Sequence, residues 1–317
     1  MDLLTPTPHE IARAFELGDP DGGLTHVRRG DADAWRLDTS TGSYFVKGYL
    51  QDVTDQLTVA MAFEGRALEA GLDMPEPVEP ADPVVGWAAR VEDRLFRVHR
   101  WIEPLSCAPD VDIWLGRTMA QVHQLEPLGG GDLPEWWRQA IKPPAVWDDW
   151  IAEAPSRDVG WADRLSDSLP LIHAATARLA ELCDNGVPDL VTTHGDFKPH
   201  NIVRSLSGPV LVDWDSVRID SAALEAGRTA YIFGGGDPER IRGILAAYVD
   251  AGGALAWAGP DLFLSVARNH LQVLSDLVQA SLGQTAAAPW MGDHRTIDAA
   301  IGNRLQDLSG KLEGRAG

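Results

Sequence analysis

Two short segments in the second half of the chain carry the residue types that phosphoryl transfer needs. The first, HGDFKPHN, spans residues 194–201, and the second, LVDWD, spans residues 211–215. Asp196 could accept a proton from a hydroxyl group, whereas Asn201 and Asp213 offer hard oxygen ligands, which suit Mg²⁺ better than Zn²⁺. This combination is typical of the catalytic loop and the metal loop of a phosphoryl-transfer enzyme.

The stretch between the two segments predicts a β-hairpin. Residues 202–204 and 210–212 are apolar enough for two short strands, and the sequence SLSGP between them is a turn. A hairpin would bring Asn201 and Asp213 to the same end, facing one metal and phosphate site. The alternative is that the aspartates only cap a turn and a strand end, and the joined pattern argues against it.

At these motifs the chain resembles the aminoglycoside phosphotransferase and choline kinase family, a bacterial branch of the protein-kinase-like fold. His194-Gly195-Asp196 stands where protein kinases typically have His-Arg-Asp, which favours a small-molecule kinase. The resemblance covers roughly residues 20 to 235 and implies an α+β, bilobal fold. In that fold an N-terminal antiparallel sheet with a helix precedes an α-rich C-terminal lobe. Lys198 would either reach the transferred phosphate or be a solvated lysine, and both readings stay open.

The N-terminal third predicts a first helix capped near Thr7 or Pro8, then strands, then a second helix. The strands are expected at residues 24–29, 34–38 and 43–49, and the second helix from about residue 53 to 72.

Lys47 lies in the third of these strands, and Glu64 shares the apolar face of the second helix with Leu57, Met61 and Leu68. A buried carboxylate needs a partner. We therefore expect Lys47 and Glu64 to form the ion pair that positions nucleotide phosphates in kinases. The alternative places Glu64 at the edge of the apolar stripe.

Two further strands are expected at residues 86–91 and 95–102. The resemblance makes the second of them the hinge between the lobes, with backbone groups around Arg100 and Ile102 binding the adenine edge. It places the lobe boundary near residue 103, so that residues 1–102 bind the nucleotide and residues 103–317 bind the acceptor and carry the catalytic residues. The phosphate loop departs from the expected pattern, because residues 29–34 hold one glycine and two aspartates.

The remaining chain predicts an α-rich lobe with helices at about 110–125, 165–183, 222–233, 238–251, 260–282 and 296–312. His123 is expected to be structural, and Gly129-Gly130-Gly131 to be a flexible joint. Asp215 is interpreted as a helix cap rather than a second metal contact.

Five of the chain's 12 tryptophans lie within 26 residues, alternating with the acidic residues Asp148, Asp149 and Glu153. They are Trp136, Trp137, Trp147, Trp150 and Trp161. Aromatic faces beside carboxylates would suit a cationic amine. The simpler reading is that these rings pack a helical insert onto the lobe.

Composition describes an acidic globular chain. Its 317 residues carry a formal net charge of −20, which repels nucleic acid and anionic membranes and attracts cations. The sequence contains no run of about 18 apolar residues, so it predicts no membrane-spanning helix. The N-terminus lacks the pattern of a signal peptide. Cys107 and Cys183 fit a reducing cytoplasm. We expect a monomer or homodimer.

These observations favour a kinase that transfers the γ-phosphoryl group of ATP (or GTP), with Mg²⁺, to a hydroxyl of a small acceptor. Asp196 would be the base, Asn201 and Asp213 the metal ligands, and Lys47 the phosphate contact. The acceptor is expected to be a small cation such as an aminoglycoside-like antibiotic or amino sugar. An antibiotic acceptor would mean a role in antibiotic resistance, whereas the sequence leaves open whether the role is resistance or metabolism. The alternatives are a kinase of a neutral metabolite such as homoserine or methylthioribose, a non-catalytic nucleotide-binding protein of the same fold, and a two-metal phosphohydrolase.

Overall fold

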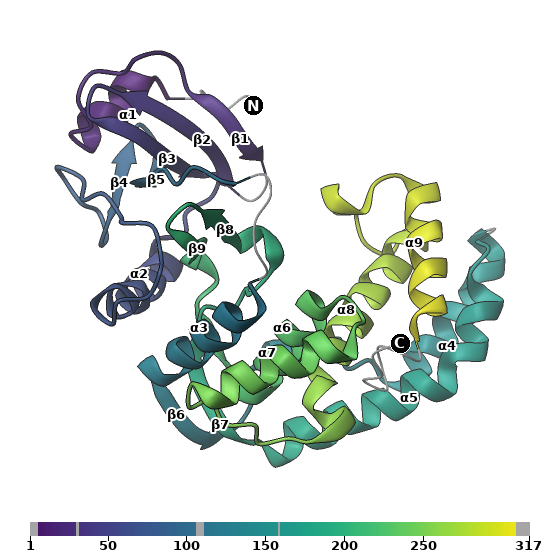
Figure 1. Ribbon diagram of the computed structural model, residues 1–317. Coiled ribbons are helices and arrows are strands. Elements are labelled where there is room, and N and C mark those ends of the chain that lie inside the picture. The colour runs from purple at the N-terminus through teal and green to yellow at the C-terminus, as the bar shows by residue number, and fades with distance from the viewer. Residues whose placement is uncertain (1–5, 30–31, 106–110, 158, 309–317) are drawn as a thin grey trace. The chain divides into compact units, whose positions relative to one another are not determined.

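The computed structural model describes residues 6–29, 32–105, 111–157 and 159–308 (Figure 1). The chain forms two compact units. The first consists of Met1–Val111 and His194–Arg218, and the second of Asp112–Thr193 and Ile219–Gly317. Both sequence motifs therefore lie in the same unit as the N-terminal sheet. The functional division into lobes at residue 103 stays a prediction.

The first unit is built on a five-stranded antiparallel sheet in the order β1-β2-β3-β5-β4. The strands are β1 (Thr25–Arg29), β2 (Ala32–Thr39), β3 (Gly42–Tyr49), β4 (Ala88–Val91) and β5 (Arg94–Arg100). Its helices are α1 (Pro8–Ala14) and α2 (Thr54–Glu69). The expected sheet and helices are thus confirmed, including the first cap, since the Thr7 side chain accepts from Glu10 N and Glu10 bonds back to Thr7 N.

The two faces of this sheet bury different helices. Side chains such as Trp35 and Val46 pack with α1, whereas Leu95 and Ala88 pack with Leu57 of α2. Because successive side chains in a strand point to opposite faces, the odd-numbered residues of β3 and β5 face α2.

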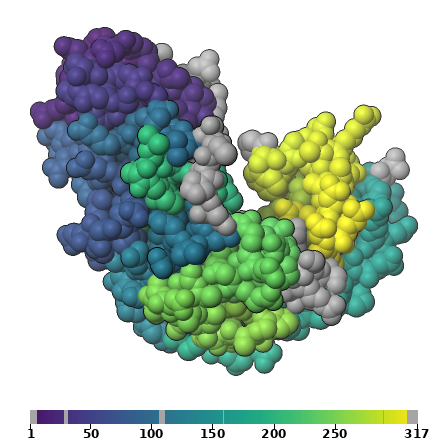
Figure 2. All heavy atoms as spheres, viewed as in Figure 1, coloured from purple at the N-terminus to yellow at the C-terminus, as the bar shows by residue number. Residues whose placement is uncertain are grey.

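The expected hairpin is present in the first unit. It consists of β8 (Ile202–Ser205) and β9 (Gly208–Leu211), with Ile202 opposite Leu211, and is flanked by the 3₁₀ turns η3 (Pro199–Asn201) and η4 (Trp214–Ser216). Leu211 N donates to Asp73 O and Leu105 N donates to Arg204 O, at 2.9 and 2.8 Å. In the space-filling view, green atoms of the hairpin lie directly against blue atoms of this unit (Figure 2).

The second unit is rich in helices, as expected. They are α3 (Asp112–Leu125), α4 (Pro144–Glu153), α5 (Ala162–Asn185), α6 (Ala222–Gly234), α7 (Pro238–Asp250), α8 (Leu264–Ser281) and α9 (His294–Gln306), with 3₁₀ turns η1 (Glu135–Ala140), η2 (Ala154–Arg157), η5 (Gly259–Phe263) and η6 (Pro289–Met291). A small sheet has the order β10-β7-β6, from β6 (Pro127–Gly131), β7 (Val187–Thr193) and β10 (Arg218–Ser221).

Two expectations for this unit have clear outcomes. His123 is buried, with hydrogen bonds to Tyr248 (3.0 Å) and Glu225 (3.1 Å), which fits its expected structural role. The glycine run expected to be a flexible joint is instead strand β6, and that expectation was wrong. A Cβ at Gly186 would lie 2.7 Å from the carbonyl oxygen of Gly131, so the absence of side chains lets the backbones approach closely here.

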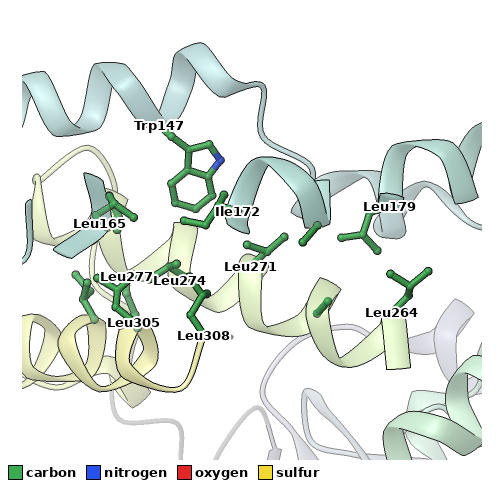
Figure 3. Close-up of a cluster of buried hydrophobic side chains, with 14 of the residues drawn as sticks. Trp147, Leu165, Ile172, Leu179, Leu264, Leu271, Leu274, Leu277, Leu305 and Leu308 are labelled. Carbon is green, nitrogen blue, oxygen red and sulfur yellow. The ribbon is translucent and has the colours of Figure 1, made fainter. Parts of the chain in front are cut away.

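The tryptophan-rich segment forms part of the hydrophobic core of the second unit, not a cage for a cation. Trp147 is fully buried, with leucines of α5, α8 and α9 nearby in the same core (Figure 3). Trp150 is also buried, but Asp148 and Asp149 between them are exposed. The ring of Trp136 already faces a cation, the guanidinium of Arg268 at 4.5 Å. The aromatic and carboxylate groups therefore diverge, and the cation-cage reading of this segment was wrong.

No helix in the described parts of the chain has both the length and the apolar character that crossing a membrane requires.

Candidate active site

A buried histidine fixes the start of the catalytic loop. His194 Nε2 lies 3.0 Å from Val212 O, and Asp196 N donates to His194 Nδ1 at 3.2 Å. The ring must therefore carry its proton on Nε2. It packs against the rings of Phe197 and Trp214, with centroids 5.3 and 4.8 Å away. His194 thus ties the backbone of Asp196 to the metal loop.

Glycine is the only residue type that fits at position 195, between His194 and Asp196. Its φ is +80°, and a Cβ built on it would lie 2.1 Å from Ser216 O. Any side chain would collide with this carbonyl, which is backbone and cannot turn aside. The His-Gly-Asp sequence is therefore a packing requirement of this loop.

The carboxylate of Asp196 is held by residues of its own loop. Asn201 Nδ2 donates to Asp196 Oδ2 at 2.8 Å and to Asp196 O at 2.9 Å, and Lys198 Nζ lies 2.6 Å from Oδ1. His200 is more distant, at 4.0 Å from Oδ2. The side chain of Asp196 remains 18% exposed. The carboxylate is thus oriented and reachable, as a base acting on a bound hydroxyl must be.

Asn201 and Asp213 lie at the same end of the hairpin, as expected. Val212 N donates to Asn201 O at 2.9 Å. Because Asn201 gives its amide nitrogen to Asp196, its Oδ1 is the atom that could face a cation. Asp213 has left-handed backbone angles (φ 67°, ψ 60°), a conformation that is uncommon outside glycine and is often found at functional sites.

The donor set fits Mg²⁺. Amide and carboxylate oxygens are its preferred protein ligands, and Mg²⁺ usually takes only one or two of them besides water and substrate phosphates. Within the described residues, no three His, Cys, Asp or Glu side chains are arranged to hold a metal ion.

Lys47 faces the metal loop. Its Nζ lies 2.5 Å from Asp213 Oδ1 and 2.6 Å from Asp215 Oδ2. Burial disfavours the charged form of Lys47, but Asp215 and Asp213 outweigh this effect, so its pKa is raised. The expected Lys47–Glu64 ion pair is wrong, because Glu64 instead pairs with Arg97 of β5 and with His99, at 3.2 Å from the latter.

The physical reason is the strand register. Lys47 and Arg97 are directly opposite each other in β3 and β5, so both face α2. The longer, forked arginine reaches Glu64, which is fully buried. Burial opposes the charge on Glu64, but Arg97 and then His99 outweigh it and lower its pKa.

The interpretation of Asp215 as a helix cap is wrong. Its carboxylate contacts Arg97 Nη1 at 2.5 Å and Lys47 Nζ at 2.6 Å, and it accepts a hydrogen bond from Tyr49 OH at 2.7 Å. Burial favours the neutral acid, but Lys47 and Arg97 outweigh burial, and the pKa of Asp215 lies well below its usual range. Sequence reasoning missed Arg97 and Tyr49, although the β3–β5 register places both beside Lys47.

At the hinge, part of the backbone is already occupied. Arg100 N donates to Glu76 O at 2.9 Å and Trp101 N donates to Ser43 O at 3.0 Å. The carbonyl of Arg100 and the backbone of Ile102 remain the groups proposed for the adenine edge. In the phosphate loop, Asp33 pairs with Arg94 at 3.3 Å, and Asp31 lies outside the described residues.

Comparison with known proteins adds to this geometry. Residues 26–261 match the model of the phosphotransferase enzyme family, APH. The chain belongs to this family. Its match spans the sheet, α2, the catalytic loop and the metal loop, so the predicted family resemblance is confirmed. Among curated proteins, none matches the sequence of this chain significantly.

Solved structures show the same fold at low sequence identity. A spectinomycin phosphotransferase in complex with ADP and spectinomycin is 12% identical, with a TM-score of 0.64 and coverage of 99% of this chain and 98% of that one. An amicoumacin kinase with AMP-PNP and Ca²⁺ is 11% identical (TM-score 0.66; 97% and 93%). A choline kinase from Streptococcus pneumoniae is 14% identical (TM-score 0.57; 96% and 97%). The protein-kinase-like fold predicted from the sequence is therefore confirmed.

Proposed function

We propose that this member of the phosphotransferase family transfers the γ-phosphoryl group of ATP or GTP to a hydroxyl of a small molecule. One observation supports it most: Asn201 orients the Asp196 carboxylate at 2.8 Å, while Asp213 lies at the same end of the hairpin. A base and a metal ligand set thus share one rigid element, as in-line phosphoryl transfer requires.

Each side chain has a distinct role in this proposal. Asp196 accepts the hydroxyl proton and aims the attacking oxygen at the γ-phosphorus. Lys198, 44% exposed beside Asp196, is able to turn toward the transferred phosphoryl group. Lys47 contacts the nucleotide phosphates, and the backbone of Arg100 and Ile102 binds the adenine edge. Asn201 and Asp213 would hold Mg²⁺, which neutralises charge on the phosphates.

The acceptor is proposed to be a small hydroxyl-bearing cation, such as an aminoglycoside-like antibiotic or amino sugar. The net charge of −20 supports this class, because a negative field concentrates cations. The tryptophan-rich segment gives no support to a cationic acceptor, because its tryptophans are buried in the core of the second unit. A neutral metabolite is the second candidate acceptor. Similar structures include a spectinomycin phosphotransferase and a microcompartment-associated aminopropanol kinase, and both spectinomycin and aminopropanol are amines, which fits the cationic class.

The experiment is an ATP- and GTP-consumption screen over hydroxylated antibiotics, amines, amino sugars and neutral metabolites, with Asp196→Asn as the inactive control. Turnover that requires both an acceptor and Asp196 supports the proposal. Nucleotide binding without turnover on any acceptor favours a non-catalytic nucleotide-binding protein.

The charge of the acceptor has its own test. For a cationic acceptor we expect KM to rise with ionic strength, because the Debye length falls from about 10 Å at 0.1 M salt to about 3 Å at 1 M. Steady-state kinetics across this salt range, with an osmotically matched sucrose control, measures it. A KM that does not respond to salt would argue for a neutral acceptor and leave the kinase proposal intact.

A further inference from the structure

We propose that Arg97 is a positioning residue that holds the metal loop through Asp215 and takes the place of the strand lysine as the partner of Glu64. Lys47 is thereby left to serve the nucleotide phosphates. The inference rests on the proposed function, because it assigns the metal loop a role in binding Mg·nucleotide.

The first support is the position of two cations side by side. Arg97 and Lys47 are cross-strand neighbours on the α2 face of the sheet. Like charges directly opposite each other are destabilising unless an anion lies between them. Asp215 supplies that anion, with one oxygen on each cation at 2.5 and 2.6 Å. The second amino group of Arg97 pairs with Glu64, so the guanidinium bridges two carboxylates.

An arginine suits this task better than a lysine. Its planar fork presents several donors in fixed directions, whereas a lysine is a single flexible point charge. Arg97 is 2% exposed and its partner Glu64 is fully buried. The bridge between α2 and the metal loop is therefore shielded from solvent, whereas Lys47, 18% exposed, has solvent access.

Asp215 is held from three elements of the first unit. Besides Arg97 of β5, Tyr49 of β3 donates its hydroxyl to the carboxylate, and Gln56 of α2 donates Nε2 to Asp215 O at 2.8 Å. Asp215 lies only two residues after Asp213, whose backbone is left-handed. Fixing Asp215 therefore helps to fix Asp213 in the orientation in which it would meet a metal ion.

The charges around the metal loop explain why Lys47 alone would not be enough to hold Asp215 in place. The carboxylates of Glu64, Asp213 and Asp215 face the two cations Lys47 and Arg97. When Lys47 turns to the nucleotide phosphates, Arg97 remains as the buried countercharge of Asp215. Without Arg97, Asp215 would compete with the phosphates for Lys47, and once Lys47 turned away Asp215 would be left with the neutral donors Tyr49 and Gln56.

The test measures Mg²⁺ dependence of AMP-PNP binding by calorimetry, which needs no acceptor. For Arg97→Met we expect the Mg²⁺ concentration for half-maximal binding to rise about 10- to 100-fold, the usual effect of losing a residue that orients a metal ligand. Arg97→Lys should give a smaller rise. It keeps the buried charge, so it serves as the measured variant if Arg97→Met fails to fold.

Arg268→Met is the matched control. Arg268 is a buried arginine of α8 in the second unit, where its Nη2 donates to Trp136 O and its guanidinium faces the Trp136 ring. Its loss should lower the melting temperature and leave the Mg²⁺ midpoint unchanged.

The sign of the shift is decisive. If Arg97 acted only as a nearby positive charge, its removal would tighten Mg²⁺ binding. A midpoint that falls or stays constant in a folded Arg97 variant would overturn the inference while the proposed function stands. A wild-type protein that binds no Mg·AMP-PNP would overturn the proposed function, and this inference with it.

Discussion

At the scale of single residues, several polar atoms of the site already have a hydrogen-bond or ion-pair partner within the protein. Asn201 gives its amide nitrogen to Asp196, and Lys47 spans Asp213 and Asp215. The oxygens of Asn201 and Asp213 are then the groups at this end of the hairpin that can accept a metal ion. Asp213 is charged and Asn201 is neutral, so we expect their replacement by alanine to have different effects on binding and catalysis.

We expect Asp213→Ala to weaken Mg·nucleotide binding more than Asn201→Ala does, because it removes a charged ligand from a site for a hard cation. Asn201→Ala should instead lower kcat more than it raises the dissociation constant, since it also releases the Asp196 carboxylate. Calorimetry of Mg·AMP-PNP together with steady-state kinetics measures both. Unchanged affinity in Asp213→Ala would mean that the metal binds elsewhere.

At the scale of elements, the catalytic loop depends on close backbone packing against the metal loop. The ring of His194 contacts the carbonyl of Val212, and the Cα of Gly195 packs closely against the carbonyl of Ser216. A loop packed in this way cannot accept a side chain at residue 195 without moving the base.

We expect Gly195→Ala to lower both the melting temperature and kcat, because a Cβ at 2.1 Å from Ser216 O forces the loop to shift. Gly71→Ala is the matched control. Gly71 also has a positive φ, of +76°, but a Cβ there meets nothing within 4 Å. The control pays only the backbone strain, about 1 kcal/mol. Equal losses in the two variants would contradict the packing argument.

How far the sequence predicts these elements depends on the range of the contacts. The hairpin and the helix cap at Thr7 follow from local turn and cap chemistry, and both are present. The partner of Glu64 does not follow, because a helix pattern shows that a carboxylate is buried but not which neighbouring strand supplies the cation. Closeness in the sequence also misled at Trp147 and Asp148, since neighbours on a helix point about 100° apart.

At the scale of the whole molecule, buried ion pairs link the site to stability. Glu64 and Asp215 have pKa values lowered from the ordinary 4.5 and 3.8. Their ionised forms therefore stabilise the fold fully above these ordinary values. This stabilisation is lost as the pH falls below about 4.5 toward the lower folded-state pKa values, because the unfolded chain takes up protons first.

We expect the free energy of unfolding of the wild type to decline steadily with acid below about pH 4.5. The double variant Glu64→Gln/Asp215→Asn should be less stable at neutral pH but should decline less steeply in acid, because two of the proton-binding groups are gone. Urea denaturation at a series of pH values measures this. Parallel acid profiles would show that these carboxylates do not dominate acid stability.

The central claim, that Asp196 directs transfer of a phosphoryl group to an acceptor, is tested most directly by following a label from the γ-phosphate of the nucleotide. With an acceptor found by the screen, the wild type should place the label on an acceptor hydroxyl. Asp196→Asn should bind Mg·AMP-PNP nearly as the wild type does, with kcat lower by about two to four orders of magnitude. Label appearing as inorganic phosphate without an acceptor, or Asp196→Asn retaining more than about half the wild-type rate, would contradict the account.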